Sequence, residues 1–234
     1  MNAVTLQVTL FFVTCYLLPV IVLFPMLKYL LFDLDNTLYS RRYGLENNVS
    51  RRIFEFASAL LGIPPEEVRR QRMEARKQYG TCLEWLMTEE GFTDVEAYFA
   101  AVHPPGEADT LVPDGELRAF LAGIPIPKAV LTNAPREHAD LVLDKLGISD
   151  LFTHIIDVRQ CDFLGKPRRE FFEYALRTLG VSIDEVLFVD DHPFYVEGFL
   201  ALGGRGILLD EDNFHSDYTQ PRIRELKEIT RYIG

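Results

Sequence analysis

The chain carries the run Leu30-Leu31-Phe32-Asp33-Leu34-Asp35-Asn36-Thr37-Leu38, in which two aspartates follow an apolar segment. The apolar part is typical of a buried strand. Side chains alternate along a strand, so Asp33 and Asp35 share one side of the chain as it leaves the sheet. Two close, unpartnered carboxylates repel each other and resist burial, so a protein keeps them mainly for a cation or for chemistry. The D-x-D-x-T pattern is weak by itself, and the rest of the chain gives it meaning.

Apolar runs predict five strands, and amphipathic patterns predict helices between them. The strands are expected at 29–34, 128–132, 152–156, 185–190 and 206–209, and the helices between them at 114–122, 135–146, 168–179 and 193–202. Near-continuous hydrophobicity is typical of a parallel sheet covered on both faces. Strands that alternate with helices therefore predict an α/β fold with a doubly wound parallel sheet. A last helix is expected at 222–233.

Residues 44–110 break this alternation, because they contain no convincing strand. Four amphipathic helices are expected there, at 45–61, 65–79, 81–90 and 94–102. We interpret the segment as an all-helical cap inserted after the first strand and hinged near 39–44 and 103–112. Such a cap closes over a substrate and excludes water from it. The catalytic core is then made of residues 26–43 and 111–234.

Three further polar clusters follow apolar runs or lie in a loop. They are Thr132-Asn133, Lys166 within Phe163-Leu164-Gly165-Lys166-Pro167, and Asp190-Asp191. Ligands of an open parallel sheet bind beyond the carboxyl ends of its strands, so we expect these groups to gather with the first aspartates at one edge. Together they supply a nucleophile, hydroxyl and amide donors, an ammonium and a metal-binding carboxylate pair. That set indicates phosphoryl transfer.

These four motifs, in this order and spacing, resemble the haloacid dehalogenase superfamily of phosphohydrolases from about residue 26 to about residue 210. The resemblance implies a Rossmann-like core with a cap after the first strand. The runs Phe32-Asp33-Leu34-Asp35-Asn36-Thr37-Leu38-Tyr39 and Tyr79-Gly80-Thr81 resemble the pyrimidine 5'-nucleotidase branch. Relatives that cleave carbon–halogen bonds do not need the second aspartate, so Asp35 argues against dehalogenation.

The resemblance also implies roles for the core residues. Asp33 would be the nucleophile that forms an aspartyl-phosphate, and Asp35 would protonate the leaving oxygen and later take a proton from water. We expect their environments to separate their pKa values, with Asp33 ionised and Asp35 acting as the acid. Thr132 and Asn133 would donate hydrogen bonds to phosphoryl oxygens, and Lys166 would neutralise charge on Asp33 and on the phosphoryl group.

The expected cofactor is Mg²⁺, a hard ion that prefers octahedral oxygen ligands. Its protein ligands would be the Asp33 carboxylate, the Asp35 backbone carbonyl and Asp190. Asp191 would be a further ligand or would hold a metal-bound water.

Candidate substrate-binding residues outside the core motifs are Arg42 in the hinge and Tyr79 and Thr81 in the cap. Ordinary packing and solvation explain these three equally well. Glu84 stands where relatives often carry an arginine, which weakens any specific claim for pyrimidine nucleotides. Arg169 replaces a second proline after Lys166-Pro167, which puts the shape of that loop in doubt.

Histidines offer little from sequence alone. His192 follows the acidic pair, and a helix-capping role is expected for it. The remaining histidines show no metal-ligand spacing and are expected at the surface. They are His103, His138, His154 and His215.

Composition bounds the possible partners. The chain has 234 residues, a formal net charge of −11 and three widely spaced cysteines. Nothing basic and continuous is present to neutralise a phosphate backbone, which argues against a nucleic acid polymer. The cysteines show no C-x-x-C pairing, which indicates a reduced protein without disulfides. The sequence predicts no particular oligomeric state.

The first 27 residues carry no charged side chain and are long enough to span a bilayer. Residues 1–25 are either an apolar extension from a start placed too far upstream or a membrane anchor. The first interpretation is favoured, because no Lys or Arg precedes the run and almost no linker separates it from the first strand. It predicts a cytoplasmic protein without membrane contact. An anchor would still leave the catalytic domain in the cytoplasm, because Lys28, Arg41 and Arg42 follow it.

The residues and the resemblance together predict an enzyme, a Mg²⁺-dependent phosphomonoesterase similar to pyrimidine 5'-nucleotidases. Its partner would be a small phosphomonoester, such as the nucleoside monophosphates UMP and CMP. A phosphatase or phosphomutase for another small phosphate, such as phosphoglycolate, is an alternative. A non-enzymatic phospho-acceptor akin to a receiver domain is another. It is disfavoured because the acidic pair comes last here and a helical insertion interrupts the fold.

Overall fold

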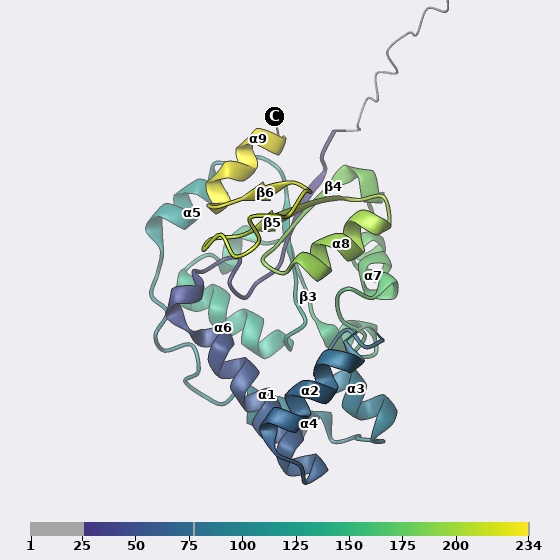
Figure 1. Ribbon diagram of the computed structural model, residues 1–234. Helices are drawn as coiled ribbons and strands as arrows, with labels where there is room; N and C mark the ends of the chain where they lie inside the picture. Colours follow the sequence, from purple (N-terminus) through teal and green to yellow (C-terminus); the bar gives the residue numbers. More distant parts are fainter. Residues whose placement is uncertain (1–25, 77, 234) are drawn as a thin grey trace, which may run out of the picture.

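The computed structural model describes residues 26–76 and 78–233, which form a parallel sheet covered by helices (Figure 1). The sheet has six strands in the order β3-β2-β1-β4-β5-β6, and every neighbouring pair is parallel. The strands are β1 (Tyr29–Phe32), β2 (Lys128–Leu131), β3 (His154–Ile156), β4 (Val186–Asp190), β5 (Arg205–Leu209) and β6 (Arg222–Ile223). This order confirms the predicted doubly wound α/β fold, in which the strand order reverses beside β1.

Helices cover both faces of the sheet. They are α5 (Gly115–Ala122), α6 (Arg136–Leu146), α7 (Arg169–Leu179) and α8 (Pro193–Ala201). Alternate residues of β1 point to opposite faces, as the two-residue period of a strand requires. Phe32 belongs to the buried cluster that contains Val142 of α6, whereas Leu31 belongs to the cluster that contains Phe171 of α7 and Phe199 of α8. The near-continuous hydrophobicity of β1 follows from this burial on both faces.

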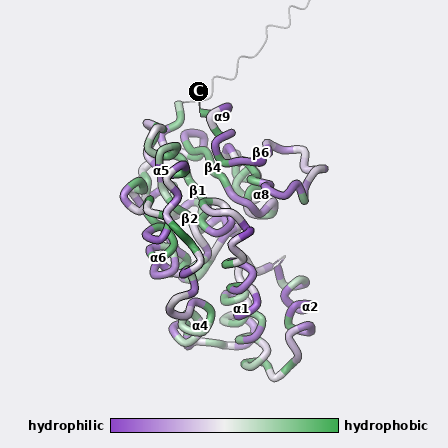
Figure 2. Tube along the Cα trace, turned by 90° about the vertical axis from the view of Figure 1, so that its left-hand side faces the viewer, coloured by the Kyte–Doolittle hydropathy of each residue, from purple (hydrophilic) through white to green (hydrophobic). Residues whose placement is uncertain are grey.

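Four helices follow β1 before the chain returns to the sheet. They are α1 (Leu45–Leu61), α2 (Pro65–Ala75), α3 (Cys82–Glu89) and α4 (Val95–Val102). They lie together beyond the carboxyl ends of the central strands, and α1 contacts both α2 and α4 (Figure 1). In the side view, α2 is largely hydrophilic, in agreement with its single buried residue, Val68 (Figure 2). This group therefore packs around α1, and α2 contributes only one buried side chain to that packing.

The end of the chain differs from the prediction of one helix over 222–233. Residues 222–223 form β6, followed by a 3₁₀ turn at Leu226–Ile229 and the short helix α9 (Thr230–Ile233). Backbone hydrogen bonds from Leu208 to Pro221 and from Asp210 to Ile223 attach β6 to β5. A strand of two residues satisfies backbone hydrogen-bonding groups of its neighbour, but it is too short to show an alternating apolar pattern in the sequence.

The predicted N-terminal extension or anchor at 1–25 lies outside the described residues. Within 26–76 and 78–233, no helix combines the length and the apolar character needed to cross a membrane.

Candidate active site

A buried lysine joins the carboxyl ends of the two central strands. Asp33 follows β1 directly, and its backbone amide donates to the Val189 carbonyl of β4. The Lys166 Nζ lies 2.5 Å from Asp33 Oδ1 and 2.7 Å from Asp190 Oδ2, and Lys166 is 0% exposed. Thr37 donates its hydroxyl to the other Asp33 oxygen at 3.1 Å. The first aspartate, the loop lysine and the first residue of the late acidic pair thus meet, although 133 positions separate Asp33 from Lys166.

Asp191 completes a cluster of three carboxylates. One oxygen each from Asp33, Asp190 and Asp191 lie within 4.8 Å of one another. Asn36 donates to Asp191 at 3.3 Å, and the Arg41 guanidinium lies 3.8 Å from Asp191. Burial and the other two carboxylates raise the pKa of Asp191 well above its ordinary value.

The charges of this cluster are not balanced by Lys166 alone. Burial raises the pKa of Asp33, the Lys166 ammonium opposes that rise, and Asp190 and Asp35 add to it. Burial alone would lower the pKa of Lys166, but Asp190 and Asp33 raise it. A buried excess of negative charge is costly unless a cation compensates it. An all-oxygen set of carboxylates suits Mg²⁺, so these residues fit the expected ion.

Asp35 has a different environment from Asp33. Its Oδ1 accepts a hydrogen bond from the Tyr39 hydroxyl at 2.5 Å and lies 2.9 Å from His138 Nε2. Burial alone would raise the pKa of Asp35, but the charge and hydrogen bond of His138 and the Tyr39 hydrogen bond lower it. In the protein alone the pKa of Asp33 is thus raised by burial, and that of Asp35 is lowered mainly by His138, a partner that the sequence did not reveal. The predicted ionised state of Asp33 assumes a bound cation and stays a prediction.

His138 is buried, so its predicted place at the surface is wrong. It lies on α6, it is 1% exposed, and its second ring nitrogen, Nδ1, is 2.6 Å from Glu107 Oε1. Burial alone would lower the pKa of His138, but Asp35 and Glu107 raise it to about 10. His103 is also largely covered, and its Nδ1 lies 3.0 Å from the same Glu107 oxygen. Of the predicted histidine roles, the capping role of His192 is confirmed, because its ring accepts from the Phe194 amide at the start of α8.

Asn133 and Thr132 follow β2 and shape the backbone around the lysine. Asn133 accepts from the Lys166 amide at 2.7 Å and donates to the Lys166 carbonyl at 3.1 Å. A Cβ on Gly165 would lie 2.6 Å from the Asn133 side-chain oxygen, so only glycine fits there. Thr132 is buried, and its hydroxyl oxygen accepts from the Ala134 amide at 3.0 Å. This clamp holds the Lys166 loop without the second proline, and Arg169 instead begins α7.

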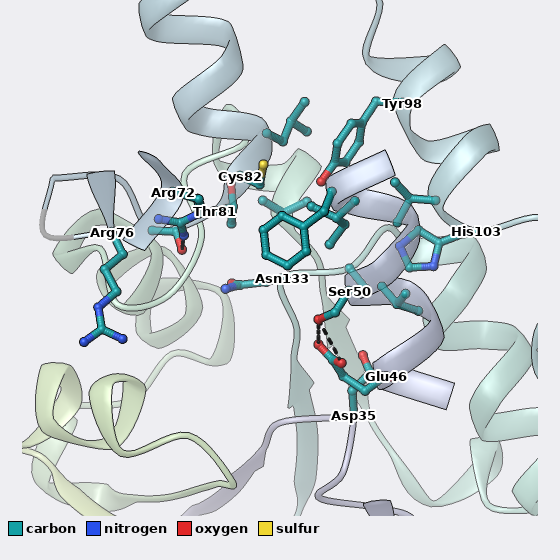
Figure 3. A pocket seen from close by; sticks show the side chains of 18 of the residues that line it. Asp35, Glu46, Ser50, Arg72, Arg76, Thr81, Cys82, Tyr98, His103 and Asn133 are labelled. Carbon is teal, nitrogen blue, oxygen red and sulfur yellow. Dashed lines mark hydrogen bonds between the residues drawn. The ribbon is translucent and has the colours of Figure 1, made fainter. Parts of the chain in front are cut away.

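A cavity of about 350 Å³ separates the sheet edge from helices α1 to α4 (Figure 3). Asp35 lies at one end of it, beside Glu46, which accepts hydrogen bonds from Ser50. Its apolar walls come mainly from α1 and α4 and include Val49, Ile53, Phe54, Tyr98 and Phe99. Arg72 and Arg76 lie on one side of the cavity, and His103 lies on the opposite side (Figure 3). The space is therefore apolar in its walls and charged at several points of its rim.

A family model described as haloacid dehalogenase-like hydrolase matches residues 27–203. The chain belongs to this family. Solved structures agree on the fold: L-2-haloacid dehalogenase from Xanthobacter autotrophicus has a TM-score of 0.57 and 17% identity, over 89% of this chain and 100% of that one. A HAD phosphatase from Thermococcus onnurineus has a TM-score of 0.57 and 21% identity, over 89% and 98% of the two chains.

Two curated relatives each match 80% or more of this chain. Phosphate metabolism protein 8 of Saccharomyces cerevisiae is 29% identical over 203 residues, and the match covers 80% of this chain and 63% of the yeast protein. The chain thus spans less than two thirds of the length of that relative. Glyceraldehyde 3-phosphate phosphatase of Methanocaldococcus jannaschii is 28% identical over 233 residues, which cover 89% of this chain and 99% of the archaeal protein.

The candidate cap and hinge residues of this family member have different placements. Thr81 lines the cavity, while its hydroxyl oxygen caps α3 by accepting from the Glu84 amide. The Tyr79 hydroxyl instead donates to Glu89, and Tyr79 does not line the cavity. Arg42 lies 3.7 Å from Glu211 with 79% of its side chain exposed, and it does not line the cavity either. Of these three residues only Thr81 lines the cavity, and substrate contacts of Tyr79 and Arg42 stay a prediction.

Glu84 and Arg72 make contacts in the folded protein that the sequence did not predict. Glu84 accepts from the Gly80 amide and forms an ion pair with Arg168, just before α7, so it joins the helical group to the core. Arg72 donates through Nη2 to the Gly80 carbonyl at 2.9 Å. Its Nη1 is buried and has no hydrogen-bond partner within the part of the chain that the structure describes. Nothing in the sequence indicated these contacts, although Glu84 stood out as a departure from the family, and both residues meet at Gly80.

Proposed function

We propose that the protein is a Mg²⁺-dependent phosphomonoesterase that works through an aspartyl-phosphate on Asp33. The observation that carries the proposal is the Lys166 ammonium between Asp33 and Asp190, at 2.5 and 2.7 Å, beside a third carboxylate. Phosphoryl transfer depends on positioning and on opposite charge around the phosphoryl group, and this cluster can supply both. The phosphatase activity in the name of the archaeal relative, aligned over 99% of its length, supports the same reaction class.

In the first step, an Asp33 oxygen attacks phosphorus and the bond from phosphorus to the leaving oxygen breaks. Asp35 gives that oxygen a proton. The arriving phosphate is a like charge near Asp35, which raises the pKa of this residue and favours its protonated form. Lys166 keeps the attacking carboxylate in place, and the Thr132 hydroxyl, whose oxygen already accepts from Ala134, can donate its proton to a phosphoryl oxygen.

In the second step, water attacks phosphorus, Asp35 takes the proton of that water, and the bond from phosphorus to Asp33 breaks. Inorganic phosphate and the free Asp33 carboxylate result, so atoms and charges balance. The residues that would hold Mg²⁺ are Asp33, Asp190, Asp191 and the carbonyl of Asp35. When bound, the ion would supply positive charge that neutralises the phosphoryl oxygens.

We further propose that residues 44–110 act as a cap and that the cavity beneath it receives the leaving group. Its volume of about 350 Å³ falls in the range of about 300–1,000 Å³ that is usual for pockets of whole small molecules. Apolar walls suit the faces of a nucleobase and a ribose, and the guanidinium of Arg72, which lines the cavity, suits a carbonyl or anionic oxygen. These features support a nucleoside monophosphate, such as UMP or CMP, as the substrate.

A smaller sugar phosphate is the second candidate, because the name of the archaeal relative specifies glyceraldehyde 3-phosphate. A triose would occupy the cavity without contacting most of its apolar wall. A nucleotide would therefore contact more of the apolar cavity wall than a triose phosphate would.

The test is release of inorganic phosphate from UMP, CMP, glyceraldehyde 3-phosphate, phosphoglycolate and p-nitrophenyl phosphate, with Mg²⁺ and with EDTA. We expect turnover only with Mg²⁺ and the highest kcat/KM with a nucleotide. Asp33→Asn should abolish turnover, whereas Asp144→Asn, a change at an exposed position of α6, should not. Substantial phosphate release by the Asp33 variant would refute the nucleophile. A higher kcat/KM for glyceraldehyde 3-phosphate than for the nucleotides would instead support the second candidate, a sugar phosphate.

A further inference from the structure

Both hydrogen bonds that Asp35 makes through its side chain go to the same oxygen. Tyr39 and His138 are each bonded to Oδ1, at 2.5 and 2.9 Å. Among the described residues, Oδ2 has no hydrogen-bond partner, and Asp35 lines the cavity. The carboxylate is thus held by one oxygen, while the other is free for a proton of the substrate or of water.

The ring of His138 is fixed from its other side. Nδ1 lies 2.6 Å from Glu107 Oε1, so both ring nitrogens face carboxylates and both act as donors. A rotated ring would remove one hydrogen bond from each of two largely buried carboxylates. His138 therefore has one orientation that satisfies its surroundings.

Glu107 is itself anchored, by residues of the candidate cap and its connector. Its side chain is 1% exposed, and Arg52 of α1 donates to its Oε2 at 2.8 Å. His103 lies 3.0 Å from its Oε1. The Arg52 Nε also donates to the Val102 carbonyl at the end of α4. A continuous chain of contacts thus runs from the helical group through Glu107 and His138 to Asp35.

We propose that His138 is a positioning residue that fixes the direction of the Asp35 carboxylate, with Glu107 as its anchor. The proposal rests on the proposed phosphatase function, in which Asp35 acts in both steps. It predicts that the second step depends most visibly on His138. Nitrophenolate leaves without needing a proton, whereas water must always lose one to attack phosphorus.

His103, Glu107 and His138 have ligand atoms within 4.8 Å of one another, so this cluster could also be interpreted as a metal site. The Arg52 guanidinium, 2.8 Å from Glu107, already supplies the positive charge there. Positioning therefore explains this cluster better than a metal does.

The test compares His138→Leu and His138→Gln with p-nitrophenyl phosphate and Mg²⁺. For the leucine variant we expect kcat and KM to fall together by about 10- to 100-fold, a part of the usual contribution of acid–base catalysis. kcat/KM should stay within about 3-fold, since the first step is spared. A burst of nitrophenolate and an accumulated phosphorylated enzyme should accompany the change. Glutamine retains a donor toward Asp35 and should restore part of kcat.

Two further variants sharpen the test. Glu107→Gln should show the same burst with a smaller loss, and the double variant should be no worse than His138→Leu. His154→Leu, on the edge strand β3, is the matched control and should leave both parameters unchanged. A fall of kcat/KM in step with kcat and without a burst would overturn the proposal. So would stoichiometric Zn²⁺ in the wild-type protein that is lost in Glu107→Gln.

A crystal structure of His138→Leu decides the matter independently of turnover. The Asp35 carboxylate should leave its wild-type direction, and an unchanged carboxylate would overturn the proposal. If the wild-type protein releases no phosphate, the proposed function fails, and this structure still tests the positioning role.

Discussion

Replacement of Lys166 by methionine tests the electrostatics on which the site depends. Methionine fills a similar space but leaves Asp33 and Asp190 without the ammonium that lies 2.5 and 2.7 Å from them. The Lys166 side chain is 1% exposed, so water cannot replace the lost charge. Removal of one partner from a buried ion pair usually costs about 3–5 kcal/mol. For a chain of 234 residues this corresponds to a Tm lower by about 6–20 °C, at about 2–4 °C per kcal/mol.

The loss should depend on pH with a definite sign. Lys166 is the main group that opposes the raised pKa of Asp33, so without the ammonium the pKa of Asp33 in the folded variant rises further above the unfolded value of about 3.9. The folded variant then binds more protons than its unfolded chain, so its free energy of unfolding falls as the pH rises. Lys166→Met should therefore lose more stability, relative to the wild type, at pH 8 than at pH 5.

The assay is urea unfolding of wild type and variant at both pH values, in EDTA and in Mg²⁺. Mg²⁺ that binds only the folded protein adds about 2.7 kcal/mol at 100 times its Kd, and it should offset part of the loss. Lys128→Met is the matched control, because buried Lys128 donates to the carbonyls of Ile124 and Ile126, at 2.8 and 3.0 Å, and lies away from the carboxylate cluster. Its response to Mg²⁺ should equal that of the wild type. Equal stability of Lys166→Met and wild type in EDTA at pH 8 would refute this reasoning.

Two further predictions concern the cavity and the buried histidine. Arg72→Met should lower kcat/KM for UMP by about 10- to 150-fold, the loss of one charged hydrogen bond of about 1.5–3 kcal/mol, but should leave p-nitrophenyl phosphate within about 3-fold. Arg70→Met, at an exposed ion pair with Glu67, is its control, and equal losses on both substrates would exclude a specificity role. The pKa of His138 is raised from 6.5 to about 10, so its stabilising contribution is complete below pH 6.5 and is lost as the pH rises toward 10. Urea unfolding between pH 6 and pH 10 should show a shallower decline for His138→Leu than for wild type, and parallel curves would contradict this.

Local patterns in the sequence were sufficient for the core of the fold and for the position of its central acidic groups. The apolar run before Asp33 is buried on both faces of the sheet, and its period and length are visible without any long-range contact. The carboxyl ends of parallel strands share one edge, so residues directly after β1, β2 and β4 must come together. Lys166 joins them by a loop whose course the sequence suggested only through its neighbours Gly165 and Pro167.

The surroundings of Asp35 were decided by the tertiary structure alone. His138 is separated from Asp35 by 103 positions and from Glu107 by 31, and neither His138 nor Glu107, taken singly, differs in pattern from a solvated polar residue. The lowered pKa of Asp35 follows from this network. Packing of separate elements also buries the Nη1 of Arg72. Periodicity records which side of a helix or strand is apolar, whereas the partner of a buried charge depends on how separate elements pack. That is why the burial of the strands and the parallel character of the sheet could be predicted from the sequence, and the electrostatics of the site could not.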